Sequence, residues 1–242
     1  MQQQSDASPI KQESIYCCCI LSTGVRIGRQ ETVLFFFWYV ENMAFSAYKA
    51  IILIDNGYLS AILRDEFNST RVDYLKLSEE ISRGFLRLRS YVYDALPYQA
   101  NPPTAYQSQL LASKQRFFHS IGQLPSFDVR FGKQRPRGTV YVQKGVDILL
   151  AIDMIRLSSK QQIHKAFLIA GDADYVPVVK ASKDEGVSVT LYHSGAMQTT
   201  ADGRQFKKYS DELWQACDER KEITQALIDR VKITVPDQSA TA

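Results

Sequence analysis

The sequence is poor in the residues that build disulfide frameworks and zinc sites. It contains four cysteines, of which three are adjacent at Cys17 to Cys19 and the fourth is Cys217, far along the chain. No paired Cys or Cys/His spacing of a zinc site is present. Its three histidines are equally scattered, at His119, His164 and His193. A secreted disulfide scaffold is therefore excluded, and a reducing, cytoplasmic location is expected.

Long hydrophobic runs and a large charge of one sign are also missing. The longest apolar run, TVLFFFWYV at 32–40, falls well short of the roughly 20 residues that span a bilayer. The formal net charge of +3 permits a polyanionic partner without requiring one. We therefore expect no membrane partner, and charge alone does not decide the function.

The first 42 residues differ in character from the rest of the chain. They combine a Gln/Ser-rich start, the CCCILSTG segment and the aromatic run, and Met43 follows directly. We predict that 1–42 is an extension, either disordered or translated upstream of a native start at Met43; a short membrane-associating or partner-binding segment is the alternative. A single domain is expected over 43–220, followed by a helix end and tail over 221–242.

After Met43, apolar runs and helical patterns alternate. Strands are expected at 49–55, 90–98, 127–132, 165–171 and 187–195, and helices at 57–67, 74–88, 104–121, 146–158 and 174–186. The segment 206–231 reads as helical with breaks, and 133–145 is too rich in Pro, Gly and charge for regular structure throughout. The pattern predicts an α/β fold, a Rossmann-like three-layer α/β/α sandwich around a mainly parallel sheet.

Four aspartates fall where such a sheet would bring them together. Asp55 closes the first strand, Asp172 follows the strand of 165–171, Asp174 opens the next helix, and Asp147 lies near the start of its helix. Two unit charges about 4 Å apart repel by roughly 4 kcal/mol at an effective dielectric near 20, so a cation is expected between them. An all-oxygen site suits Mg²⁺ or Mn²⁺, which can activate water for attack on a phosphodiester.

Simpler roles for these acids stay open. Asp172 could cap the helix that begins near Asp174, and Asp55 with Asn56 and Gly57 could form a turn. Asp153 lies six residues after Asp147, about 240° around an ideal helix, so the two do not share a face. Asp153 is therefore expected either behind the metal ligands or in a structural salt bridge.

Three ordered segments carry a resemblance to a known family. IDNGYL (54–59), QKGVDILLAIDMI (143–155) and LIAGDADYVPVVKASKDEGVSVTLY (168–192) resemble the NYN-domain proteins, a branch of the PIN-like nuclease superfamily. The resemblance runs from about residue 50 to residue 218. It implies a PIN-like fold and a metal-dependent endonuclease, most often acting on RNA, with its acids at Asp55, Asp147, Asp172 and Asp174.

The chain departs from that family at two positions. Ala173 replaces a common serine, and Tyr58 stands where many members have asparagine, so Asn56 is the substitute amide for substrate binding. The closing helix of the family resembles SDELWQACD, which makes Asp211 an outer ligand candidate. His193, near the end of the strand predicted at 187–195, is a candidate for an outer position around the same four acids.

One basic segment is a candidate for gripping the substrate. Residues 130–145 contain no acid and include Phe131 and Tyr141, whose rings could stack on bases. Its basic residues are Arg130, Lys133, Arg135, Arg137 and Lys144. The alternative interpretation is a solvated surface loop.

The leading hypothesis is a Mg²⁺- or Mn²⁺-dependent endoribonuclease, with DNA as the alternative substrate. A non-catalytic RNA-binding or regulatory module that keeps the acids is the second hypothesis. A phosphatase or Toprim-type enzyme is the third hypothesis. A phosphatase would need an Asp-x-Asp directly after the first strand, and a Toprim enzyme would need an upstream glutamate at a strand end; this sequence shows neither. Association into a homo-oligomer stays open.

Overall fold

The computed structural model describes residues 48–137, 140–199 and 202–234. The predicted extension over 1–42, with the triple cysteine, lies outside these residues. Within the described ranges, no helix combines the length and the apolar character needed to cross a membrane.

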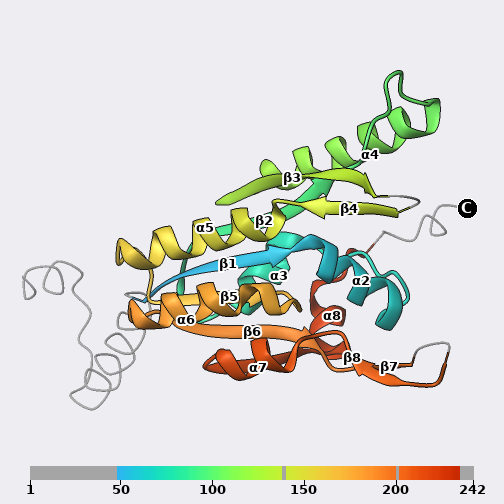
Figure 1. Cartoon of the computed structure of the whole chain (residues 1–242). Coiled ribbons are helices and arrows are strands. Elements are labelled where there is room, and N and C mark those ends of the chain that lie inside the picture. The colour runs from blue at the N-terminus through green and yellow to red at the C-terminus, as the bar shows by residue number, and fades with distance from the viewer. Residues whose placement is uncertain (1–47, 138–139, 200–201, 235–242) are drawn as a thin grey trace, which may run out of the picture. The chain divides into compact units, whose positions relative to one another are not determined.

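A seven-stranded sheet forms the centre of the fold, with the strand order β4-β3-β2-β1-β5-β6-β9 (Figure 1). Six strands are parallel, and β4 alone runs antiparallel to its neighbour. The strands are β1 (Lys49–Asp55), β2 (Leu86–Leu96), β3 (Phe127–Arg137), β4 (Val140–Lys144), β5 (Lys165–Ile169), β6 (Ser188–Ser194) and β9 (Glu219–Ile223). A separate two-stranded ribbon pairs β7 (Met197–Thr199) with β8 (Gln205–Lys207).

Helices cover both faces of the sheet, because the central strands are buried on both sides. In β1, Ile52 and Ile54 pack into one core, and Ile51 and Leu53 into the other. The first core is closed by α2 (Asn56–Glu66), α3 (Tyr74–Ile81), α4 (Ala105–Gly122) and α8 (Gln225–Val231). The second is closed by α5 (Val146–Ser159), α6 (Val176–Asp184) and α7 (Asp211–Ala216). The expected three-layer α/β/α sandwich is confirmed.

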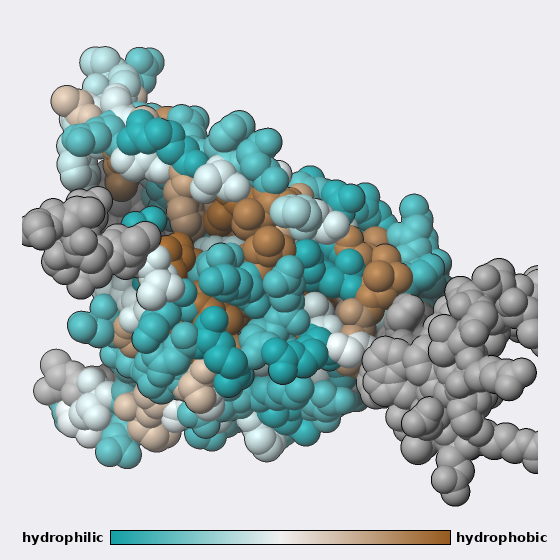
Figure 2. Space-filling model, turned by 180° about the vertical axis from the view of Figure 1, so that it is seen from behind, coloured by the Kyte–Doolittle hydropathy of each residue, from teal (hydrophilic) through white to brown (hydrophobic). Residues whose placement is uncertain are grey.

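The helix layer with α3, α4 and α8 faces the viewer in Figure 2. Hydrophilic residues dominate this face, and hydrophobic residues collect in a band across it (Figure 2). Leu86, Phe117 and Ile233 are among the large apolar side chains of the fold that are more than a third exposed.

Several predicted elements are confirmed near their expected bounds. β1 spans the predicted 49–55, and α5 covers the predicted 146–158. α4 begins after Thr104, whose hydroxyl accepts from the Gln107 backbone N–H while the Gln107 side chain returns to the Thr104 N–H. This capping box fixes the helix start.

The helix predicted over 74–88 is wrong beyond Ile81. α3 ends at Ile81, and Gly84 takes a left-handed backbone conformation with φ 86° that no helix continues through. Strand β2 then begins at Leu86, where apolar and basic residues alternate.

The basic segment expected to be irregular is instead a β-hairpin. β3 continues to Arg137 and pairs with β4, from Lys133 opposite Lys144 to Arg137 opposite Val140. Pro136 is tolerated because β2 pairs with β3 only as far as Lys133, so the missing N–H removes no bond to β2.

The segment 206–231 contains a strand that its helical pattern did not predict. β9 adds a parallel edge strand to β6, and only Ile223 of its five residues is buried. The following α8 buries Leu227, Ile228 and Val231 in the first core. The fold therefore runs on past residue 220, where the sequence placed the end of the domain.

Candidate functional site

The candidate site lies where the chain changes direction across the sheet. From β1 the chain proceeds to β2 and β3 on one side, and it later returns to β5 and β6 on the other. Ligands of open parallel sheets bind at the carboxyl ends of the strands beside such a switch point. Asp55 ends β1, and Asp172 follows β5, so both acids reach this edge.

One buried tyrosine joins two of the predicted acids. The Tyr175 hydroxyl lies 3.2 Å from Asp55 Oδ2 and 2.7 Å from Asp147 Oδ1. Tyr175 is fully buried in the second core. Burial, the charge of Asp55 and the contact with Asp147 raise the Tyr175 pKa far above its usual value, so the hydroxyl stays protonated and donates to the carboxylates.

Asp55 is held in a partly desolvated position. Its Oδ1 accepts from the Tyr58 backbone N–H at 3.1 Å and caps α2. Burial raises the Asp55 pKa above its usual value, and the nearby Asp147 charge adds to this, while the hydrogen bonds from Tyr58 and Tyr175 act against it. A cation at this position would relieve both unfavourable effects.

Asp147 reaches the same place from the first turn of α5. The helix begins directly after Gly145, and no side chain caps it. A carboxylate suits a helix N-terminus, because the helix dipole is positive there. Asp55 at the end of β1 and Asp147 in α5 therefore both contact the Tyr175 hydroxyl.

Asp172 and Asp174 are both exposed, in the connection from β5 to α6. Asp172 Oδ1 accepts from the Asp174 backbone N–H at 3.1 Å and caps the short 3₁₀ helix Ala173–Tyr175. The capping role for Asp172 is therefore confirmed. Asp172 also lines the same pocket as Asp55.

The four acids do not form one tight cluster. Across the described ranges, no three His, Cys, Asp or Glu side chains gather closely enough to bind one metal ion directly. The structure instead pairs Asp55 with Asp147 through Tyr175, which corrects the expectation of four carboxylates in one coordination sphere. Two carboxylates with water are nevertheless a ligand set that Mg²⁺ accepts, so the oxygen-only pair fits such an ion.

A pocket of about 520 Å³ opens beside Asp55 and Asp172. Its other lining residues come from α2, from the connection after β5, and from the end of β8 and the segment that follows it: Tyr58, Gly171, Ala173, Lys207, Lys208, Tyr209 and Ser210. Acids, cations and aromatic rings thus share one surface.

Tyr58 and Gly171 fit against each other in the wall of this pocket. A Cβ atom on Gly171 would lie 2.4 Å from Tyr58 Cε2 and 2.5 Å from the Lys208 carbonyl oxygen. The Tyr58 hydroxyl accepts from the Ser194 backbone N–H at 3.1 Å, and burial raises the Tyr58 pKa to about 12. Tyr58 is therefore a fixed wall residue that links α2 to β6 and to the connection after β5.

Asn56 does not offer its amide to a substrate. It is buried, its Nδ2 donates to Asp94 Oδ2 at 2.6 Å, and the Tyr74 hydroxyl donates to its Oδ1. The expected substrate-binding role is corrected to a structural one.

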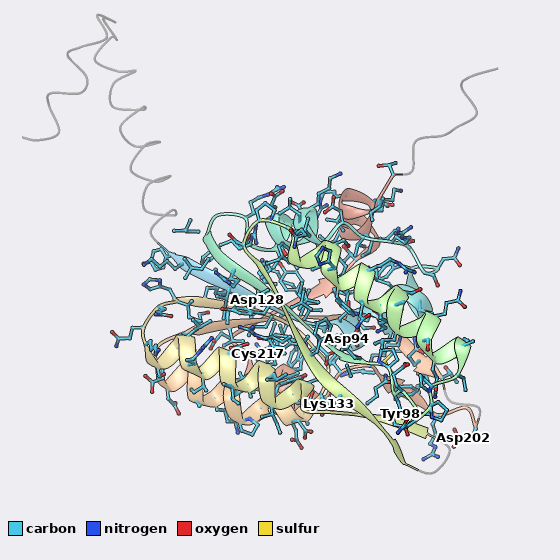
Figure 3. The ribbon with its side chains drawn as sticks, turned by 90° about the horizontal axis from the view of Figure 1, so that it is seen from above. Asp94, Tyr98, Asp128, Lys133, Asp202 and Cys217 are labelled. Carbon is cyan, nitrogen blue, oxygen red and sulfur yellow. The ribbon has the colours of Figure 1, made fainter. Side chains whose placement is uncertain are left out.

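Asp94, its partner, was missed by the sequence analysis. It is buried near the end of β2, beside α4, and pairs with Lys114 of that helix at 2.9 Å (Figure 3). Its signal in the sequence is a single acid inside the apolar strand pattern SYVYDAL.

Arg130 is engaged by acids inside the fold. It pairs with Asp128 at 3.0 Å and with Asp153 at 3.3 Å. Asp153 also accepts from the Tyr93 hydroxyl at 3.1 Å and from Arg156 at 3.0 Å. The salt-bridge interpretation of Asp153 is confirmed, and Arg130 is not available as a free phosphate ligand.

Lys133 is the member of the basic segment that the structure shows exposed. It lies farther along β3 than Asp128, toward the hairpin with β4 (Figure 3). The backbone register places it opposite Lys144. The side chains of Arg135, Arg137 and Lys144 lie outside the described residues.

His193 and Asp211 each contact a residue that lines the pocket. The His193 ring is buried, 4.5 Å between centroids from the Tyr209 ring, and its Nδ1 lies 2.8 Å from the Ser194 carbonyl oxygen. Asp211 pairs with Lys207 at 2.8 Å on the surface. His193 therefore packs behind the pocket lining, while Asp211 pairs with a lining lysine at the surface.

Comparison with known proteins supports the fold and gives a family. The NYN domain family model matches residues 49–223. A crystal structure of a protein of unknown function, VPA0982 from Vibrio parahaemolyticus RIMD 2210633, aligns with a TM-score of 0.54 and 19% identity, covering 77% of this chain and 96% of that one. At that identity the likeness shows the fold alone. No curated protein matches the chain.

Proposed function

This chain belongs to the NYN domain family, within the PIN-like nuclease superfamily, and on that premise we propose that it is a metal-dependent endonuclease that hydrolyses RNA. The observation that carries the proposal is the pair Asp55 and Asp147 on one hydroxyl, beside Asp172 at the switch point of the sheet. Two acids are held close together in a partly buried place, where their repulsion is unfavourable for the fold unless a cation or a reaction uses them.

Asp55 and Asp147 are proposed to hold Mg²⁺ or Mn²⁺ together with water, with Asp172 and Asp174 as outer partners. When bound, such an ion supplies an activated water and neutralises charge on the phosphate. Tyr175 keeps Asp55 and Asp147 oriented, and Tyr58 fixes the α2 end of the pocket. The basic side chains of the β3–β4 hairpin, of which Lys133 is exposed, are proposed to hold RNA phosphates. We place the enzyme in the cytoplasm.

The second candidate is an RNA-binding or regulatory module without turnover. Two observations favour it: no three metal-binding side chains meet in the described residues, and Tyr58 stands where many members of the resembling family have asparagine. The two candidates differ in whether bound RNA is cut.

A cleavage assay with titrated metal tests the proposal. The full chain is incubated with single-stranded RNA, structured RNA, and single- and double-stranded DNA, over a series of Mg²⁺ and Mn²⁺ concentrations. We expect RNA cleavage that EDTA abolishes. Asp172→Asn should abolish it without unfolding the protein, because asparagine caps a helix as well as aspartate does. Binding of RNA with no cleavage of any substrate at any metal concentration would favour the second candidate.

Tyr175→Phe tests whether a cation belongs between Asp55 and Asp147. The substitution removes the donor that both carboxylates share. We expect the free energy of unfolding in EDTA to fall by about 1–3 kcal/mol, because two partly buried acceptors lose their partner. Added Mn²⁺ should restore much of this loss, since the ion replaces the lost positive end of the hydroxyl.

Tyr93→Phe is the matched control for this substitution. Its hydroxyl donates to Asp153 in the same core, but Arg130 and Arg156 already neutralise that acid. The loss of stability for Tyr93→Phe should be the same with and without Mn²⁺, as followed by urea unfolding. Equal metal responses in the two variants would contradict the cation site.

A further inference from the structure

The pocket beside Asp55 has an aromatic residue and a cation on the wall formed by the end of β8 and the residues that follow it. Tyr209 is half-buried and lines the pocket. Its ring lies 4.5 Å between centroids from the buried His193 ring, and the exposed Lys207 Nζ lies over the Tyr209 ring, 5.3 Å from its centroid, where a stacking base would displace it. An aromatic face next to an ammonium group is a surface that nucleotides bind.

Tyr209 is held in place by the contacts of its two neighbours in the chain. Its neighbour Lys208 is only 10% exposed and pairs with Asp65 at 2.9 Å and Glu66 at 3.3 Å on α2. On the other side, the Ser210 backbone N–H donates to the Gly171 carbonyl at 2.8 Å, directly before Asp172. Two anchors thus fix Tyr209 relative to both Asp55 and Asp172, which lowers the entropy lost when a ligand binds.

The two lysines of this segment have different roles. The charge of Lys208 is already neutralised by two acids inside the fold, so Lys208 is an anchor. Lys207 is 42% exposed, and its partner Asp211 is 68% exposed. Such surface pairs contribute little free energy, so a phosphate can replace Asp211 at Lys207.

We propose that Tyr209 is a stacking platform for an unpaired base of the substrate, next to the phosphate that is cut, while Lys207 contacts a neighbouring phosphate. This inference rests on the proposed nuclease site, because it takes Asp55 and Asp172 as the place of cleavage. A base inside a duplex is covered on both faces by its neighbours, so only a single-stranded or flipped base can lie on the Tyr209 ring. The pocket therefore selects single-stranded over duplex nucleic acid.

The test measures binding of single-stranded RNA by the full chain in EDTA, where no cutting interferes. The probe is a short RNA that carries one 2-aminopurine, a base whose fluorescence falls when it stacks, used alone and annealed to its complement. We expect the single strand to bind more tightly than the duplex and its fluorescence to be quenched. Tyr209→Leu should weaken single-strand binding by about 5- to 150-fold and remove the quenching, because stacking on one aromatic ring has that magnitude.

Two variants separate stacking from other effects. Tyr209→Phe keeps the ring and should bind and quench like the wild type. Tyr106→Leu removes an aromatic ring that is 73% exposed on α4, outside the pocket, and should change nothing. Leucine retains apolar packing against His193, and thermal unfolding verifies that the variants are folded.

Unchanged binding in Tyr209→Leu, or an equal loss in Tyr209→Phe, would overturn the stacking platform. The outcome is separable from that of the nuclease proposal. If the protein cleaves RNA with Mn²⁺ and this cleavage does not depend on Tyr209, the stacking role of Tyr209 is wrong and the nuclease proposal stands. If RNA binding depends on Tyr209 but no RNA is cleaved, the stacking role stands and the nuclease proposal is wrong.

Discussion

Asp55→Asn should lower kcat/KM for RNA cleavage by more than about 100-fold while the protein becomes no less stable. Even outer partners of a metal site contribute 10- to 100-fold when they are removed, so a direct ligand is expected to contribute at least as much. Stability should hold or rise for two reasons. Asparagine still accepts the Tyr58 N–H that caps α2, and it removes a charge whose burial, together with the repulsion from Asp147, raises the Asp55 pKa. Initial rates at saturating Mn²⁺ and urea unfolding in EDTA measure the two effects.

Asp153→Asn is the control for this prediction. Asp153 is also a buried acid of the second helix layer, but Arg130 and Arg156 pair with it. Its loss leaves two cations without their partner, so stability should fall while the folded fraction keeps its activity. Opposite directions in the two variants would mark Asp55 as functional and Asp153 as structural. A large loss of activity in both, or in neither, would contradict the assignment.

The acids of the site could be predicted because strand ends are visible in a sequence. The run KAIILID is apolar on both faces of the strand, so its last residue had to lie at the sheet edge, and Asp172 follows a second such run. The role of Tyr175 in the site could not be predicted from the sequence. Its position in DYVPVV fits the apolar pattern of the helix, as an ordinary core residue would. Its function depends on Asp147, 28 positions earlier, which only the tertiary fold brings to it.

The same reason explains Asn56 and the basic hairpin. Asn56 follows Asp55 directly, but the chain turns into α2 there, and the amide is directed to Asp94 of the neighbouring strand. The composition of 133–145 favours a loop, yet the alternation in VYVQK and the free edge of β3 allow a strand pair. In both cases a neighbouring strand of the sheet, β2 for Asn56 and β3 for the basic segment, determined the local structure, and local sequence propensity did not.

Gly171→Ala should destabilise the protein by about 1–3 kcal/mol and lower cleavage in the fraction that stays folded. The new methyl group would meet Tyr58 Cε2 at 2.4 Å and the Lys208 carbonyl oxygen at 2.5 Å, and overpacking of a fixed wall has this magnitude. The backbone oxygen cannot move without breaking the anchor between Ser210 and Gly171. Since Asp172 follows directly, the shift moves a proposed outer partner of the metal site. Urea unfolding and kcat/KM measure both effects.

Gly122→Ala distinguishes this crowding from the general effect of replacing glycine. Its added Cβ meets only Val129 Cγ2 at 3.9 Å, an ordinary contact, and alanine in a helix lowers the entropy of the unfolded chain. Gly122→Ala should therefore leave stability unchanged or raise it by about 0.4–1 kcal/mol.

Tyr58→Ala removes one of the two obstacles at Gly171, so the double variant with Gly171→Ala should lose less stability than the sum of the single losses. Strict additivity would show that Tyr58 and Gly171 do not press on each other, and that the tyrosine of this chain does not shape the loop of Asp172.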